Sequence, residues 1–287
     1  MKKLVLSLII LSTSNIVAAV FDPLPSDYVA PRPGLTIMSI NAFDRTTIGP
    51  YANGDKLTSD SISQRTYFLR YNYGSSFLGY TTSYGFALPY TQLKTEGSTL
   101  GSFIGTKSTG WSDFVLSSTL WLINDKKTQE YLGVTFLLVT PSGNYDDSQV
   151  LNTSENRYKY VLNLGYIKPI NESISLELSP EIAFYGDNKT NTSTTEQKPS
   201  YALNTHIRYK LDKNLELFTG YQYSYNSQTV INGINQNNEN SSNKYSFGAI
   251  YTTKNYNQFM IRYAKESSKE FGMKVKDEFL VRYRWWF

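Results

Sequence analysis

The sequence predicts an all-β protein, a transmembrane antiparallel up-and-down β-barrel of about 12 strands with long extracellular loops and short periplasmic turns. Segments that alternate apolar and polar residues recur along the chain, and short and long links between them alternate. Such a pattern is typical of an outer-membrane barrel. After the N-terminus no apolar run reaches the roughly 18 residues that a membrane-spanning helix needs. Only 18% of the residues are charged, below the roughly 25% of a soluble domain.

The N-terminus predicts a secretory signal peptide over residues 1–19. Lys2 and Lys3 precede a short apolar stretch, and the small residues Val17, Ala18 and Ala19 follow it, as signal peptidase requires. We therefore expect Sec-type export to the cell outer membrane of a Gram-negative bacterium. Removing both lysines lowers the formal net charge from +4 to +2, so no nucleic-acid partner is expected.

Residues 20–33 are rich in proline, which cannot donate to a strand ladder. This segment is predicted to be an extended periplasmic lead-in to the barrel, which covers residues 34–287. It could instead fold into the lumen as a plug, and the sequence does not decide between the two arrangements.

Twelve segments show the two-residue period of a strand with two unlike faces. In "GYTTSYGFALPY", for example, Tyr80, Tyr84 and Leu88 share one face and small residues the other. The predicted strands lie near 34–44, 65–73, 79–90, 111–122, 130–140, 157–168, 173–186, 200–211, 214–226, 244–252, 256–265 and 274–287.

A soluble sandwich or barrel with its apolar face inside would show the same alternation. The apolar face here consists mainly of tyrosine, phenylalanine and leucine, and its tyrosines gather toward strand ends. Aromatic girdles of this kind mark the two interfaces of a membrane barrel. The pattern therefore favours a barrel whose outer face contacts lipid, with outer-membrane lipid as an expected partner.

The opposite face should line the lumen. The predicted pore-lining residues are Arg70, Asp113, Glu177, Glu181, His206, Arg208, Arg262, Glu278, Arg282 and Arg284. With Arg157, Lys159, Lys210 and Glu216 they make eight basic groups against five acidic ones. The excess could favour anionic solutes. Alternatively the charges pair across strands and fill the lumen, as Glu177 and Glu181 would with His206 and Arg208.

The last strand, "FLVRYRWWF", places Phe279, Val281, Tyr283, Trp285 and Phe287 on the lipid side. In a closed barrel this strand must pair with the first, because lipid offers no hydrogen bonds to a free edge. The terminal phenylalanine with alternating hydrophobic residues resembles the signal that the barrel-assembly machinery recognises, here Tyr283, Trp285 and Phe287. That machinery is an expected partner.

The stretch from Gly110 to Asp146 resembles the family of meta-pathway phenol-degradation outer-membrane proteins, which are regarded as transporters. The matching positions are Gly110, Asp113, Asn124, Asp125, Pro141, Gly143, Tyr145 and Asp146. Ser112 stands where the family has a second glycine. The resemblance implies passage of small, hydrophobic or aromatic compounds.

The predicted function is an outer-membrane channel for passive uptake of small molecules, including hydrophobic or aromatic compounds or their carboxylates. Twelve strands should leave a narrow, partly occluded bore. Neither a cofactor nor a metal is expected.

The alternative functions are a receptor or adhesin that acts through its long polar loops, such as residues 230–244, and a lipase or protease. An enzyme would have to use the single histidine, His206, which faces inward, so no catalytic residue is assigned.

Replacing Arg208 by alanine is expected to change the conductance or destabilise the barrel, because it removes a buried cation from the lumen wall. Planar-bilayer conductance and thermal unfolding measure the two effects. Wild-type behaviour in both measurements would contradict the placement of Arg208 in the lumen.

Overall fold

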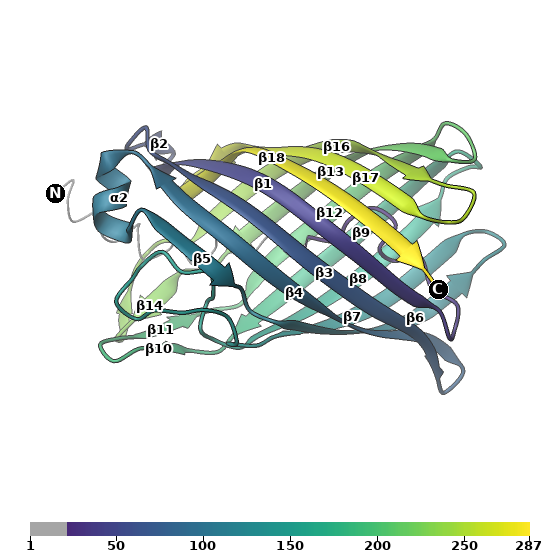
Figure 1. Ribbon diagram of the computed structural model, residues 1–287, viewed down its shortest axis with the longest axis horizontal. Helices are drawn as coiled ribbons and strands as arrows, with labels where there is room; N and C mark the ends of the chain where they lie inside the picture. Colours follow the sequence, from purple (N-terminus) through teal and green to yellow (C-terminus); the bar gives the residue numbers. More distant parts are fainter. Residues whose placement is uncertain (1–21) are drawn as a thin grey trace.

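Twelve antiparallel strands form a closed barrel in the computed structural model, which describes residues 22–287 (Figure 1). The predicted signal peptide lies outside the described residues. Each barrel strand pairs with its neighbour in the sheet order, and the last strand pairs with the first. The barrel strands are β1 (Thr36–Ala52), β3 (Ser61–Phe77), β4 (Tyr80–Glu96), β6 (Val115–Asp125), β7 (Glu130–Val139), β8 (Lys159–Pro169), β9 (Ile174–Tyr185), β12 (Ser200–Lys210), β13 (Leu215–Asn226), β16 (Asn240–Thr252), β17 (Gln258–Lys269) and β18 (Gly272–Trp286).

The pairing of β18 with β1 closes the barrel at a seam that reaches the end of the chain. The register places Met38 opposite Trp285 and Asn41 opposite Arg282. Beyond it, Thr36 and Phe287 exchange backbone hydrogen bonds of 2.8 and 3.0 Å. The prediction that the last strand runs to the terminus and leaves no edge is confirmed.

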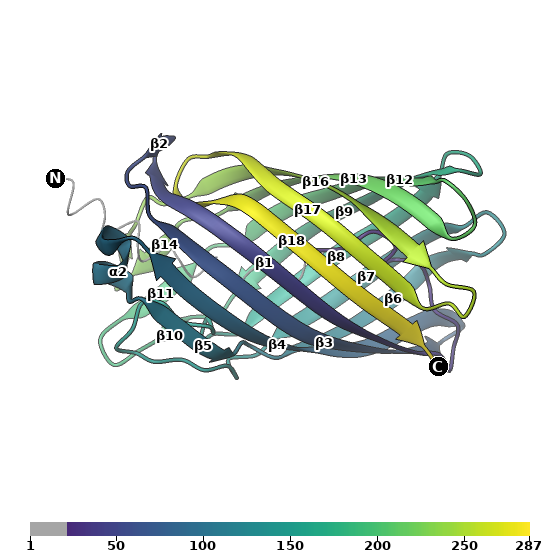
Figure 2. The same ribbon diagram turned by 45° about the horizontal axis from the view of Figure 1, so that its top comes forward.

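Turns and loops separate to opposite ends of the barrel, and both the start of β1 and the C-terminus lie at the turn end (Figures 1 and 2). Five links at this end are short, at 78–79, 126–129, 170–173, 211–214 and 253–257. Short turns mark the periplasmic end of an outer-membrane barrel.

The loop end carries secondary structure that the sequence analysis did not predict. It comprises β2 (Asp55–Lys56), the short helix α2 (Ser98–Ile104), β5 (Lys107–Trp111) and a four-stranded sheet of β10 (Asn188–Lys189), β11 (Thr194–Gln197), β14 (Thr229–Ile231) and β15 (Ile234–Asn235). Several strand boundaries lie four or more residues from their expected positions. β1 extends to Ala52 instead of ending at 44, and the expected long loop at 266–273 is a tight turn at 270–271, where Gly272 has a φ of 84°.

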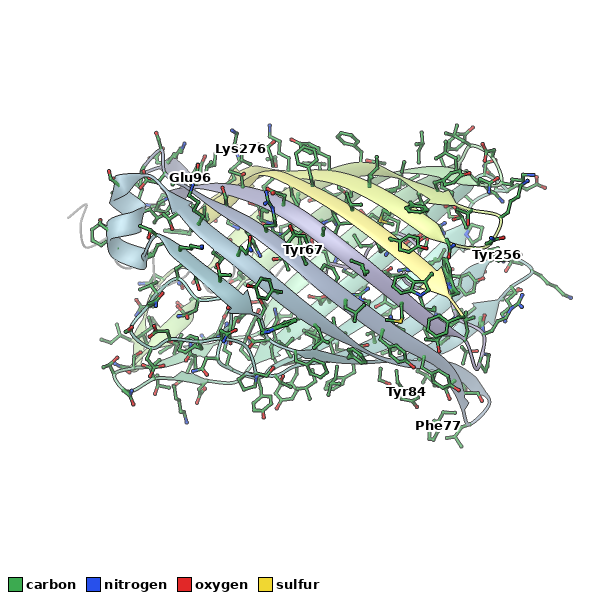
Figure 3. All side chains as sticks on the ribbon, viewed as in Figure 1. Tyr67, Phe77, Tyr84, Glu96, Tyr256 and Lys276 are labelled. Carbon is green, nitrogen blue, oxygen red and sulfur yellow. The ribbon has the colours of Figure 1, made fainter. Side chains whose placement is uncertain are left out.

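The outer surface is apolar and aromatic over the part of the wall that faces lipid. Figure 3 shows Tyr67 near mid-wall and Phe77 and Tyr84 near the turn end, whereas Glu96 and Lys276 lie near the loop end. At the seam, Tyr283 stacks on Trp285 with ring centroids 5.3 Å apart. This arrangement confirms that the apolar face of the alternating strands points outward.

The part of the chain that the structure describes contains no helix long and apolar enough to cross a membrane.

Candidate functional site

The proline-rich N-terminal segment lies inside the lumen. We call residues 22–33 the plug. This placement corrects the expectation of an extended periplasmic lead-in, at least for the described residues. Its backbone turns back on itself, since Asp27 N donates to Leu24 O at 3.0 Å and Val29 N donates to Ser26 O at 3.3 Å. Proline has no backbone N–H group that would need a hydrogen-bond acceptor inside the lumen. The segment can therefore be buried there without pairing along a strand.

An apolar cluster anchors the inner part of the plug. Leu24 is only 5% exposed. It packs against inward-facing side chains of the wall, namely Phe43, Phe68, Phe218, Ile250, Met260 and Leu280. Burying a leucine stabilises by roughly 1.5–3 kcal/mol, so this contact holds the plug independently of charge.

Asp27 binds three arginines of the wall. Its carboxylate accepts from Arg282 Nη1 at 2.7 Å, from Arg284 Nη2 at 2.5 Å and from Arg70 Nη1 at 3.1 Å. Burial would raise the pKa of the Asp27 carboxyl, but the three guanidinium groups outweigh it and hold that pKa below its usual range. Asp27 therefore stays charged at any physiological pH.

A second plug carboxylate, Asp22, binds the wall further along the lumen. Lys244 and Gln222 donate to it, and Arg262 lies 4.0 Å away. Arg262 also binds Glu278. That glutamate is 1% exposed and also binds Arg45. Pairs this deeply buried are costly to break, because removal of one partner strands the other charge.

Tyr28 occupies a niche that two glycines create in the wall. Gly133 on β7 and Gly165 on β8 stand directly opposite each other. A Cβ at Gly165 would lie 2.0 Å from the Tyr28 ring, and one at Gly133 would lie 3.0 Å from it. Trp121 Nε1 donates to Tyr28 O at 2.9 Å, and the tyrosine hydroxyl donates to Asn163. The wall is thus shaped to receive this ring.

Three of the remaining charged groups predicted to line the pore form one network of ion pairs. Arg208 binds both Glu177 and Glu216. Glu177 also accepts from Ser26 N of the plug at 3.2 Å. Glu181 accepts from Asn163 Nδ2 at 3.0 Å. Pairing across strands, one of the two interpretations left open by the sequence, describes these groups.

His206 and Asp113 do not join this network. His206 is buried against Phe218, with ring centroids 6.3 Å apart. Asp113 lies between β5 and β6 and accepts from Gly143 N at 3.0 Å, from Ser154 Oγ at 2.5 Å and from Glu155 N at 2.8 Å. Burial raises the pKa of Asp113, since desolvation outweighs these hydrogen bonds. Asp113 thus ties the 140–158 loop to the wall and lines neither of the two cavities described below.

One side of the lumen wall is apolar and uncharged. Val115 on β6 stands opposite both Ala87 on β4 and Val139 on β7. Val161 on β8 stands opposite Leu137 and Ala183. We call this set the apolar wall, and its buried members are Ala87, Val115, Leu137, Val139, Val161 and Ala183.

Two cavities lie between the plug and the wall. The larger, of about 970 Å³, is bounded by the plug, by Ala87, Val115 and Leu137 of the apolar wall, and at the turn end by Trp286 and Phe287. The smaller, of about 150 Å³, includes Asp22, Ala183 and Tyr185. Glu181 borders both. Trp286, which follows Trp285 of the lipid-facing set, therefore lines the periplasmic side of the larger cavity.

Sequence reasoning missed Asp22, Asp27, Arg45 and the apolar wall. Arg45 was missed because β1 was expected to end at residue 44. The two plug aspartates could have been predicted to bind the wall, because they lie in a proline-rich segment next to a barrel whose lumen has an excess of basic groups. Little in the sequence indicated the apolar wall, since small apolar residues occur on the inward face of many strands without any role in binding.

A closed barrel of twelve strands with an apolar outer band, short turns at one end and loops at the other defines an outer-membrane β-barrel. Its lumen holds the plug, with the two cavities between the plug and the wall. The chain belongs to the family described as "Putative MetA-pathway of phenol degradation", whose model matches residues 44–271. The resemblance noted from Gly110 to Asp146 is thereby confirmed.

Solved structures of outer-membrane proteins share the fold. An outer-membrane channel from Pseudomonas putida F1 is 25% identical, with a TM-score of 0.87 over 93% of this chain and 100% of that chain. The β domain of the Bordetella autotransporter BrkA is 10% identical, with a TM-score of 0.57 over 88% of this chain and 100% of that chain, and shows the fold alone. No curated protein sequence matches the chain.

Replacing Gly165 by valine is expected to expel the Tyr28 ring from its niche and to raise single-channel conductance severalfold, because a Cβ there overlaps the ring. Planar-bilayer recording measures the change. The same substitution at Gly186, where the nearest atom would be 3.4 Å away, serves as the control. A folded Gly165→Val barrel with wild-type conductance would show that the plug does not limit flow.

Proposed function

We propose that the protein is a passive outer-membrane channel for small solutes with an apolar or aromatic body, including their carboxylates. The single observation that carries the proposal is the cavity of about 970 Å³ between the plug and the apolar wall. Its volume is in the range of sites that bind small organic molecules.

The arrangement of charge supports this choice of solute. Charged groups lie mainly where they bind the plug or one another, whereas the apolar wall carries none. An aromatic ring passing along Val115 and Leu137 keeps apolar contacts and does not have to strip water from paired charges. Small sugars and other fully polar solutes gain nothing from such a surface.

The comparisons support the proposal at a coarser level. The Pseudomonas putida protein is an outer-membrane channel by its printed name, and the family's description refers to phenol degradation. Transport without catalysis also fits the lone histidine. Within residues 22–287, no hydroxyl or carboxyl group is hydrogen-bonded to His206, which packs against Phe218.

Flux through liposomes tests the proposed function. Phenylalanine and serine suit it because both zwitterions cross lipid slowly. We expect liposomes that contain the protein to swell faster in phenylalanine than in serine, because only phenylalanine can use the apolar wall. Equal rates, or no swelling and no conductance at all, would contradict the proposal.

The matched variants are Leu137→Asn and Leu138→Asn. They are neighbours on β7, and Leu137 belongs to the apolar wall whereas Leu138 takes the opposite face. Leu137→Asn should reduce the preference for phenylalanine severalfold, since it puts an amide into the apolar wall. Leu138→Asn should leave it unchanged.

We also propose that the C-terminal seam, with Tyr283, Trp285 and Phe287, is what the barrel-assembly machinery recognises after Sec-type export in a Gram-negative cell. Phe287 is 65% exposed and its backbone pairs with Thr36. Deleting Phe287 should lower the amount of assembled, heat-modifiable barrel severalfold in cells, while Phe287→Tyr keeps it. Full assembly of the deletion variant would rule out this role.

A further inference from the structure

The arginines around Asp27 outnumber the carboxylates that neutralise them. Arg70, Arg282 and Arg284 all donate to this one aspartate. Among the described residues, Arg70 and Arg284 have no other salt-bridge partner, so the cluster keeps two positive charges in excess. Buried charge without a counter-charge is costly, and a cluster of this kind attracts anions.

Two of the three arginines lie at the same level of the barrel wall, on either side of β1. Arg70 on β3 and Arg284 on β18 both stand opposite Ser39 on β1. Since neighbouring strands lie about 4.8 Å apart, the two arginine backbones are separated by about 10 Å. The side chain of Ser39 between them is small and only 2% exposed, and Asp27 lies between the two guanidinium groups, which both bind it.

Asp27 and the two arginines that flank it border the larger cavity. Asp27, Arg70 and Arg284 line that cavity together with Val115 and Leu137 of the apolar wall. Each of the two arginines uses a single nitrogen for Asp27, Nη1 in Arg70 and Nη2 in Arg284. A guanidinium has five N–H donors, so donors remain for a second carboxylate.

Arg282 differs from its two neighbours. It is 1% exposed, does not line the cavity, and donates to Gln258 Oε1 at 3.0 Å as well as to Asp27. It therefore holds Asp27 in place even when Arg70 or Arg284 engages another anion. The cluster thus separates into one anchoring arginine and two that face the passage.

We propose that Arg70 and Arg284 form a carboxylate-binding site in the passage, with Asp27 filling part of it and a small aromatic carboxylate taking the rest. The aromatic body then lies toward the apolar wall on the other side of the cavity. This inference rests on the proposed function for its choice of solute, and it names the residues that would select carboxylates over neutral relatives.

Binding can be measured without any transport. Fluorine NMR of para-fluorobenzoate, titrated with purified full-length protein in detergent at neutral pH, reports weak binding by line broadening. Para-fluorobenzamide has the same shape without the charge. We expect the benzoate to bind at least about tenfold more tightly than the amide, because charge-assisted hydrogen bonds are the stronger kind.

Variants assign the binding to the site. Arg70→Gln and Arg284→Gln should each weaken benzoate binding about tenfold, whereas Asp27→Asn should strengthen it by removing a competing carboxylate. The matched control is Arg65→Gln. Arg65 lies on the same strand as Arg70 but is exposed and paired with Asp44, so its loss should change nothing. Heat-modifiable migration on gels checks that each variant is folded.

Equal binding of benzoate and benzamide would overturn the site. Unchanged benzoate binding in folded Arg70→Gln and Arg284→Gln would do so as well. Either result leaves the swelling preference for phenylalanine untouched, so the channel proposal can survive failure of the site. Conversely, benzoate binding that depends on both arginines, together with no solute flux through the wild-type protein, would support the binding site and contradict the channel proposal.

Discussion

Charge neutralisation inside the barrel is the constraint on which the rest of the structure depends. The wall places Arg70, Arg282 and Arg284 on one side of the lumen, and charge there needs a partner. Asp27 supplies one counter-charge that all three arginines share, and the proline-rich segment lies inside the lumen. Once the plug takes that side, the remaining space lies along the apolar wall, and this is where the larger cavity is found.

Two kinds of contact hold the plug, and they differ in character. Leu24 and Tyr28 fill shaped apolar sites, whereas Asp22 and Asp27 satisfy charge. Packing specifies one position, because the niche opposite Gly165 fits a single ring. Charge pairing fixes the segment strongly but is less selective in geometry. Together they keep a segment with no regular secondary structure in one place.

Much of the barrel could be predicted because each strand is specified by the alternation of residues within its own short segment. The two-residue period that places Tyr84 and Leu88 outward is visible in the sequence, and so is the last strand, which continues to Trp286. The plug and the apolar wall could not be predicted, because both depend on contacts between distant residues. Tyr28 meets Gly165 only after the six barrel strands from β1 to β8 have been placed side by side, and Val115 joins Val161 only across β7.

The position of Asp27 also has a consequence for biogenesis. Its partners lie on the two strands that flank β1, with Arg70 on β3 and Arg282 and Arg284 on β18. A nascent barrel that still lacks β18 offers this aspartate only one of its three arginines. The placement of the N-terminal segment and the pairing of the last strand therefore stabilise each other.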